Sequence, residues 1–241
     1  MHIGVLITNT DDSELAKRHP RDPEKFQALL QPLRPNWTFT AVWVRDAEFP
    51  ANIKDFDGYV ITGSPASVHD GAAWIGQLLN LIRDVDEARI PTVGVCFGHQ
   101  AIALALGGTV EASPGGWGFG TATTTFSRSE PWMVPARQSL TLYAAHSEQV
   151  TRAPGGAVVL GGSAFCPIAS YRVGTHIFTT EYHPEMTLEF ISALVEELAD
   201  YLGPAVTARA RAQIRQPADG AIFAEWAVRF LEMPRRQAQR K

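Results

Sequence analysis

Cys96 is the residue whose surroundings most clearly predict chemistry. Gly94 and Gly98 flank it two positions away on either side, where an apolar run over residues 92–95 gives way to a helical pattern. A strand that turns sharply into a helix crowds the backbone at the turn, and glycine relieves that crowding. The thiol would then stand at the tip of the turn, close to helical N–H groups that favour a thiolate. A free cysteine is also commonly a small buried hydrophobe, so the pattern alone leaves both roles open.

His183 and Glu185 form a second pattern with chemical meaning, at the end of a predicted strand. Residues two apart in an extended segment face the same way, so the imidazole and the carboxylate lie side by side. Pro184 keeps His183 extended, because the residue before a proline is excluded from the helical region. A carboxylate beside an imidazole fixes its tautomer and stabilises its protonated form. With Cys96 the pair predicts a Cys-His-Glu triad; alone, it is more typical of a structural histidine near a surface carboxylate.

The turn Gly63-Ser64-Pro65 follows directly after a β-rich run over residues 58–62. Such a turn can present backbone N–H groups to a developing oxyanion, together with the N–H of Phe97 at the start of the helix. The alternative is a connecting turn with no chemical role. All three patterns fall where strands end, and α/β sheets place their sites at the carboxyl ends of their strands. We therefore expect the three patterns to meet in one site.

The periodicities along the chain predict an α/β protein. Apolar β-rich runs at 3–7, 37–44, 58–62 and 92–95 alternate with helical patterns that begin at about residues 22, 73 and 97. Strand, helix and strand in succession predict right-handed parallel βαβ units. Residues 121–180 lack helical periodicity and are expected to form short strands and turns. Two amphipathic helices, about 187–202 and a second that ends near Leu231, follow that region.

Three motifs taken together resemble a known family. Thr-Gly-Ser-Pro-Ala-Ser-Val, Gly-Val-Cys-Phe-Gly-His-Gln and Tyr-His-Pro-Glu-Met look like motifs of the class I glutamine amidotransferases, and the resemblance covers about residues 3–185. It implies a flavodoxin-like three-layer sandwich with a central, mostly parallel sheet, a small antiparallel β addition and C-terminal helices. We expect the amidotransferase domain at residues 1–202 and a helical extension, residues 203–241, packed on the same domain.

The resemblance also implies roles for individual residues. Cys96 is the expected nucleophile, with His183 and Glu185 as the rest of the triad, and the backbone N–H groups of Ser64 and Phe97 form the expected oxyanion hole. His146 is expected to be a structural member of its loop rather than a catalyst. The expected substrate-binding residues are Gly63, Gln100, Ala145, His146, Ser147 and Glu148.

The expected activity is cleavage of a γ-glutamyl amide through a cysteine thioester, with glutamine or another γ-glutamyl small molecule as substrate. Two residues depart from the family pattern: Ser64 stands where many members have a second glycine, and Ala145 replaces a polar residue found in some members. The change at Ala145 would accommodate a γ-glutamyl compound other than glutamine. The alternatives are a γ-glutamyl peptidase, an intracellular cysteine peptidase whose cysteine lies on a similar strand-to-helix turn, and a catalytically silent regulatory module.

The chain carries no P-loop motif that would bind a nucleotide, so ammonia would pass to a separate synthetase, or the protein would act alone as a hydrolase. Three roles are open for the last amphipathic helix: covering the hydrophobic core, forming the interface of a homodimer, or binding a partner protein. A formal net charge of −4 gives no indication of the positively charged surface that nucleic-acid binding requires. Two cysteines without metal-binding spacing, no signal-peptide pattern and no long apolar run predict a cytoplasmic protein without metal, cofactor or membrane attachment.

Overall fold

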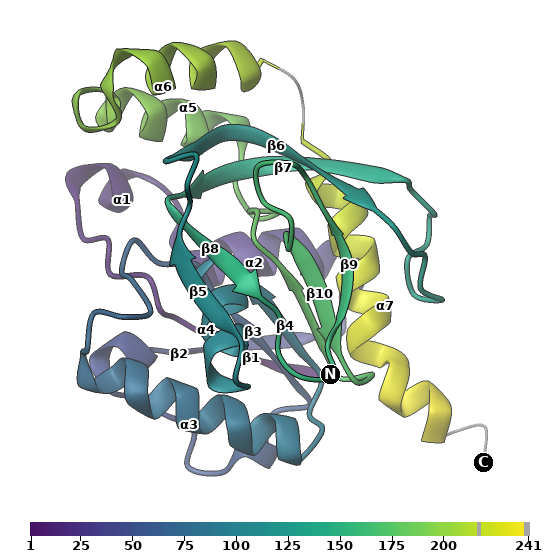
Figure 1. The fold of residues 1–241 in the computed structure, drawn as a ribbon. Coiled ribbons are helices and arrows are strands. Elements are labelled where there is room, and N and C mark those ends of the chain that lie inside the picture. The colour runs from purple at the N-terminus through teal and green to yellow at the C-terminus, as the bar shows by residue number, and fades with distance from the viewer. Residues whose placement is uncertain (216–217, 239–241) are drawn as a thin grey trace.

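In the computed structural model, which describes residues 1–215 and 218–238, a nine-stranded sheet runs through the middle of the molecule (Figure 1). Its strand order is β2-β1-β3-β4-β11-β10-β9-β6-β7, and β5 pairs with β8 in a separate two-stranded sheet. The strands are β1 His2–Leu6, β2 Thr38–Val42, β3 Gly58–Ile61, β4 Thr92–Val95, β5 Thr109–Ala112, β6 Gly118–Phe126, β7 Ser139–His146, β8 Glu148–Arg152, β9 Val158–Gly162, β10 Ser170–Val173 and β11 Ile177–Thr180.

Helices cover both faces of the sheet. They are α1 Glu14–Arg18, α2 Asp22–Leu30, α3 Ala73–Glu87, α4 Phe97–Ala105, α5 Leu188–Glu197, α6 Ala199–Gln213 and α7 Gly220–Ala238, with short 3₁₀ turns at Gln31–Leu33, Val44–Asp46 and Ile53–Asp55. Side chains of α3 and α4 share one hydrophobic core with Tyr59 and Ile61 of β3. Side chains of α2 and α7 share another with Val60, because successive strand residues point to opposite faces. This arrangement confirms the predicted three-layer α/β fold.

The half of the sheet that carries the candidate site is parallel. β2, β1, β3, β4 and β11 all pair in parallel, so the carboxyl ends of β3, β4 and β11 lie at one edge. Every residue of β3 and of β4 is buried, as expected for strands covered on both faces. The segments that follow these three strands therefore start next to one another.

The other half of the sheet is antiparallel, as the short strands predicted between residues 121 and 180 suggested. β10 pairs antiparallel with β11 and with β9, and β6 pairs antiparallel with β9 and β7. α5 and α6 lie over the outer end of this half (Figure 1), where Ile191 and Val195 of α5 pack against Phe119 of β6. These contacts place α5 beside the edge at which β11 ends.

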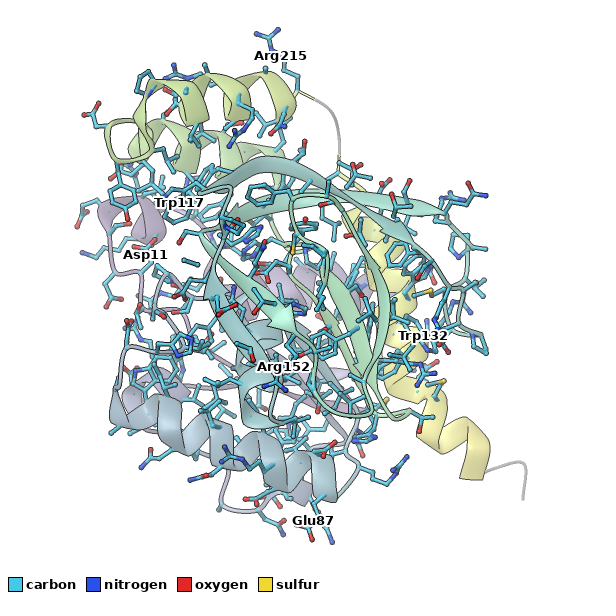
Figure 2. The ribbon with its side chains drawn as sticks, in the orientation of Figure 1. Asp11, Glu87, Trp117, Trp132, Arg152 and Arg215 are labelled. Carbon is cyan, nitrogen blue, oxygen red and sulfur yellow. The ribbon has the colours of Figure 1, made fainter. Side chains whose placement is uncertain are left out.

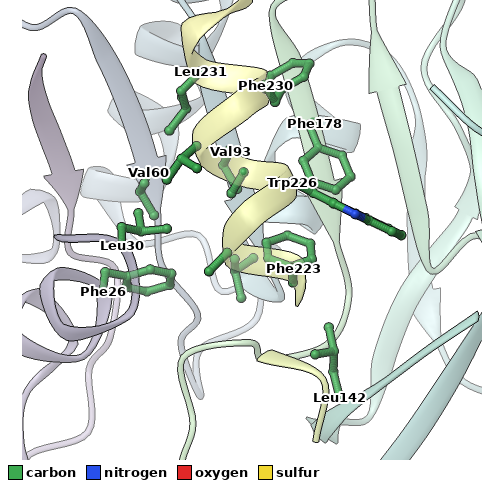
Figure 3. Close-up of a cluster of buried hydrophobic side chains, with 14 of the residues drawn as sticks. Phe26, Leu30, Val60, Val93, Leu142, Phe178, Phe223, Trp226, Phe230 and Leu231 are labelled. Carbon is green, nitrogen blue, oxygen red and sulfur yellow. The ribbon is translucent and has the colours of Figure 1, made fainter. Parts of the chain in front are cut away.

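The C-terminal helices differ from the expected pair. The helix predicted over residues 187–202 is divided, since α5 ends at Glu197 and α6 continues through Gly203, whose φ of 76° no helical residue has. α7 lies on the face of the sheet that α2 also covers, with Phe223, Trp226 and Phe230 buried against Phe178 of β11 (Figure 3). α7 therefore covers the core. Residues 216–217 and 239–241 of the proposed C-terminal extension lie outside the described residues.

No helix within residues 1–215 and 218–238 is both long enough and apolar enough to cross a lipid bilayer.

Candidate active site

Cys96 occupies a strained turn between β4 and α4. Its φ of 49° and ψ of −108° lie outside the regions that non-glycine residues usually adopt. Backbone hydrogen bonds on both sides hold it there: its N–H donates to the carbonyl of Thr180 at 2.9 Å, and its carbonyl accepts from Gln100 N–H at 2.9 Å. Strain of this kind persists only where the surrounding structure enforces it, and it clusters at functional sites.

Gly94 and Gly98 are required by the close packing around this turn. A Cβ atom on Gly94 would lie 2.5 Å from Cδ1 of Ile102, and one on Gly98 would collide with the carbonyl oxygen of Ile61. Gly98 N–H also donates to the Thr62 carbonyl at 3.1 Å, which ties the start of α4 to the end of β3. The two glycines thus serve the close approach that the sequence predicted.

His183 and Glu185 face each other directly after β11. Nδ1 of His183 lies 2.7 Å from Oε1 of Glu185, and both side chains are buried. The backbone N–H of His183 donates to the Tyr143 carbonyl at 2.8 Å, so β7 holds this segment in place. Because Nδ1 is bonded to the carboxylate, Nε2 is the ring nitrogen left to exchange a proton with a thiol or a substrate.

The Cys96 thiol and the His183 imidazole interact, and each shifts the pKa of the other. Burial raises the pKa of the Cys96 thiol, while the charge on His183 acts in the opposite direction. Burial opposes a charge on His183, but Glu185 and Cys96 together raise its pKa well above the ordinary value. Burial therefore favours the protonated thiol, whereas the neighbouring carboxylate favours a charged His183. The sulfur attacks as a thiolate, so the thiol has to lose its proton first.

The loop after β3 lies against both of these side chains. A Cβ atom on Gly63 would stand 2.7 Å from Cε1 of His183 and 3.5 Å from Cβ of Cys96, so only glycine allows the backbone so close. Thr8, at the end of β1, fixes the loop because its hydroxyl lies 3.0 Å from the Gly63 carbonyl and 2.9 Å from the Thr62 carbonyl. Ser64 follows Gly63, and its hydroxyl accepts from Ala66 N–H at 3.1 Å.

Phe97 is the first residue of α4, immediately after Cys96. The first N–H groups of a helix have no acceptor within the helix, so the Phe97 N–H is available at the tip of the turn. The structure thus brings Cys96, His183 and Glu185 together, with Phe97 next to Cys96 and Ser64 in the loop that lies against His183. The role of the Ser64 and Phe97 N–H groups as oxyanion donors stays a prediction.

The expected substrate-binding residues divide into two groups. Gly63 and Ala145 line the same cleft as His183 and Glu185. Gln100 is instead buried on the other side of the turn, where its Nε2 donates to Oε1 of Glu181 at 2.8 Å and to the Glu148 carbonyl at 3.0 Å.

His146, Ser147 and Glu148 make protein contacts of their own. Nδ1 of His146 lies 2.9 Å from the Glu148 carbonyl, and the Ser147 carbonyl accepts from Ser113 N–H at 2.8 Å. The Glu148 carboxylate accepts from the Ser67 hydroxyl at 3.0 Å. These contacts join the segment after β7 to Gln100 and to the loop after β3.

Glu181 is the centre of a buried polar cluster that the sequence did not reveal. Its Oε2 lies 3.5 Å from Nε2 of His99, and its Oε1 lies 3.8 Å from Nδ1 of His146. Burial raises the pKa of Glu181 well above its ordinary value. Burial lowers the pKa of His99 to about 3 and that of His146 to about 4. Burial thus disfavours a charge on each titratable group of the Glu181 cluster, which comprises Glu181, His99, His146 and Gln100.

A cleft of about 290 Å³ opens from His183 and Glu185 toward the molecular surface. α5, α1 and the start of β6 supply its walls, with Phe190 and Leu194 from α5, Leu15 from α1 and Trp117 beside β6. Phe190 is packed under the Lys25 ammonium, which lies 3.7 Å from the ring centre. Of these residues, Leu15, Phe190, Leu194 and Thr8 follow from no local motif. Only the position of Thr8, at the carboxyl end of a strand, could have suggested a role.

In the described part of the chain, no three His, Cys, Asp or Glu side chains are grouped so as to hold a metal ion.

Comparison with known sequences gives a consistent set of relatives. A model of the glutamine amidotransferase class-I family matches residues 27–193. Gamma-glutamyl peptidase 3 of Arabidopsis thaliana is 29% identical over 64% of this chain and 66% of that protein. A glutamine amidotransferase-like protein of Schizosaccharomyces pombe is 24% identical over 95% of this chain and 98% of that protein. One component of the glutamine-hydrolyzing GMP synthase of Methanosarcina mazei is 30% identical over 54% of this chain and 65% of that component.

Solved structures share the fold at lower identity. A glutamine amidotransferase from Thermotoga maritima superimposes with a TM-score of 0.77 and 16% identity, over 96% of both chains. One from Methylobacillus flagellatus gives a TM-score of 0.72 and 22% identity, over 95% of this chain and 93% of the other.

Proposed function

The chain belongs to the class I glutamine amidotransferase family, and we propose that it cleaves a γ-glutamyl amide bond through a thioester on Cys96. The observation that carries this proposal is the geometry around one turn: a strained cysteine, a buried imidazole that interacts with it, and a carboxylate 2.7 Å from that imidazole. A nucleophile, a base and a group that orients the base are the minimum for covalent acyl transfer.

The first half of the reaction forms the acyl-enzyme. Once the pair has lost one proton, the Cys96 thiolate attacks the side-chain amide carbon, and the backbone N–H groups of Ser64 and Phe97 stabilise the negative oxygen. The intermediate collapses as the carbon–nitrogen bond breaks, and the leaving nitrogen takes a proton from Nε2 of His183. Ammonia or an amine departs, which leaves a glutamyl thioester and a neutral imidazole.

The second half of the reaction releases glutamate. His183 takes a proton from a water molecule as its oxygen attacks the thioester carbon, and the same backbone N–H groups hold the second oxyanion. Collapse breaks the carbon–sulfur bond and restores the thiolate beside the imidazolium, while the new carboxylic acid gives its proton to solvent. Glu185 keeps the imidazole oriented in both halves.

Glutamine and larger γ-glutamyl compounds are both candidate substrates. Relatives named γ-glutamyl peptidase support a stand-alone hydrolase, and a relative named as part of a GMP synthase supports delivery of ammonia to a separate synthetase. The intact Cys96, His183 and Glu185 weigh against a catalytically silent regulatory module. We also propose that residues 1–202 form the amidotransferase domain and that α7 belongs to a C-terminal extension that packs on it.

The test compares ammonia release from glutamine with amine release from γ-glutamyl dipeptides, using the wild-type protein and Cys96→Ala. We expect turnover of at least one γ-glutamyl compound by the wild type and none by the variant. 6-Diazo-5-oxo-norleucine, a glutamine analogue with an electrophilic carbon, should label the wild type once and leave Cys96→Ala unlabelled. Labelling that persists in Cys96→Ala would overturn the assignment of the nucleophile.

A further inference from the structure

The cleft beside His183 is far larger than ammonia requires. Its volume is about 290 Å³, whereas a water molecule, which is close to ammonia in size, occupies roughly 30 Å³ of liquid. The side chains that face it beyond the triad are mostly apolar: Leu15, Trp117, Met186, Phe190, Leu194 and Leu198. Figure 2 shows Trp117 and Asp11, which both line the cleft, on the same side of the molecule near α1.

This cleft lies on the leaving-group side of the reaction. His183 lines it, and the leaving nitrogen has to approach His183 to receive a proton. Gly63 and Ala145, two of the residues expected to bind the glutamyl group, also line it, whereas Gln100, His146, Ser147 and Glu148 are absent from the described residues that do. The cleft therefore adjoins the expected glutamyl-binding residues at Gly63 and Ala145 and extends beyond them toward α1 and α5.

The charges in the cleft select against a carboxylate. Its described lining holds four carboxylates, Asp11, Asp22, Glu185 and Glu197, and one ammonium, Lys25. Lys25 is already 3.4 Å from Asp22, and Glu185 is bonded to His183. Asp11 and Glu197 remain to face a bound group, and they repel an anion there.

We propose that this cleft binds the leaving amine, and that the preferred substrates are γ-glutamyl amides of amines with an apolar body and no carboxylate. This inference rests on the proposed γ-glutamyl amide hydrolysis and adds its substrate class. Glutamine leaves the apolar walls unused, because ammonia has no apolar surface to bury. A γ-glutamyl dipeptide brings the α-carboxylate of its second residue toward Asp11 and Glu197.

Three probes separate these contributions: glutamine, γ-glutamyl-phenethylamide and γ-glutamyl-phenylalanine. The second adds an aromatic body to the leaving nitrogen, and the third differs from the second only by a carboxylate. Each buried methylene is worth about fourfold, so kcat/KM for the phenethylamide should exceed that for glutamine by about tenfold or more. It should exceed that for γ-glutamyl-phenylalanine by about tenfold, since the carboxylate is repelled.

Two variants test which residues of the cleft cause these differences in kcat/KM. Leu194→Ala should lower the ratio of kcat/KM for the phenethylamide to that for glutamine by about fivefold. Glu197→Lys should raise kcat/KM for γ-glutamyl-phenylalanine relative to the phenethylamide by about threefold at low ionic strength. Glu87→Lys is the matched control, because it makes the same change of charge on an exposed residue at the far end of α3 (Figure 2). It should leave both ratios unchanged.

The outcomes separate the two proposals. If glutamine or γ-glutamyl-phenylalanine is cleaved as efficiently as the phenethylamide, the leaving-amine site is overturned while γ-glutamyl hydrolysis stands. If none of the three compounds is cleaved, the proposed function fails. Calorimetric binding to Cys96→Ala still tests the cleft in that case: tighter binding of the phenethylamide than of glutamine supports the site, and equal binding overturns it.

Discussion

The proposed triad and the Glu181 cluster are two buried carboxylate–imidazole arrangements, and the pKa values of their imidazoles are shifted in opposite directions. In the triad, His183 lies 2.7 Å from Glu185, and its pKa is raised despite burial. In the Glu181 cluster, the imidazoles of His99 and His146 lie 3.5 and 3.8 Å from the carboxylate, and burial lowers their pKa to about 3 and about 4.

The difference shows what a buried histidine needs in order to carry a charge. A short hydrogen bond to an ionised carboxylate compensates the loss of hydration, whereas a longer contact to a carboxyl group that itself tends to hold a proton does not. Glu181 already accepts a hydrogen bond from Gln100 at 2.8 Å. Its carboxyl group therefore anchors α4 and does not form a short hydrogen bond to a histidine. We therefore propose that the triad moves protons and that the Glu181 cluster fixes geometry.

The largest expected effect on kcat comes from a comparison in which one imidazole is replaced in the triad and one in the Glu181 cluster. His183→Asn should lower kcat by about 10⁴-fold, because both the proton donor and the base are lost. His99→Asn should lower kcat by less than about tenfold and should reduce the free energy of unfolding by about 1–3 kcal/mol, since it disturbs the buried contact of His99 with Thr179. Steady-state kinetics and urea unfolding measure both. Equal losses of kcat in the two variants would refute the division between the two regions.

The next largest effect on kcat is expected when the carboxylate of Glu185 or of Glu181 is replaced by an amide. Glu185→Gln should lower kcat by about 10²–10⁴-fold, because an amide neither stabilises the imidazolium nor holds the required tautomer. Glu181→Gln should lower kcat by less than about threefold, since an amide oxygen can still accept from Gln100 and a protonated carboxyl is neutral as well. A larger loss in Glu181→Gln than in Glu185→Gln would mean that the Glu181 cluster, not the triad, carries the charge.

Thr8→Val tests the support of the oxyanion loop, with a smaller effect. The substitution keeps the shape of the side chain but removes the hydroxyl that contacts the Thr62 and Gly63 carbonyls. We expect kcat to fall about tenfold with KM nearly unchanged, because the loop donors act mainly on the transition state. A rise in KM at constant kcat would place the loop in substrate binding instead.

The two regions should also differ in an imidazole titration by NMR, in which no rate changes at all. His99 and His146 should stay neutral down to about pH 5, since their pKa values lie below that, while His183 should still be charged at about pH 7 because its pKa is raised. Glu185→Gln should lower the titration midpoint of His183 and leave the other two unchanged. A neutral His183 at about pH 7 in the wild type would contradict the comparison.

Much of the geometry of the proposed triad was predictable, because local features of the sequence position its residues. Gly94 and Gly98 announce the turn at Cys96, and the spacing of two between His183 and Glu185 is enough to bring them together in an extended segment. The Glu181 cluster was not predictable in this way. Its central hydrogen bond joins Gln100 to Glu181, 81 positions apart, and nothing near either residue specifies the partner.

The fold, too, was predictable only where it depends on residues close together in the sequence. The parallel strands and their helices follow from short-range periodicity, and the family resemblance added the order of layers. The break between α5 and α6 falls at Leu198, where no glycine or proline marks it. The cleft draws on α1, α5 and the segment before β6, which only the assembled fold brings together.

Trapping of the acyl-enzyme tests the central claim most directly. The wild-type protein is mixed with a γ-glutamyl amide, quenched in acid during turnover, and examined by intact-mass and peptide mass spectrometry. The account predicts one glutamyl group per chain, attached to the peptide that contains Cys96 and removed by hydroxylamine as expected for a thioester. Turnover without any acyl group on that peptide, or an acyl group on another residue, would contradict it.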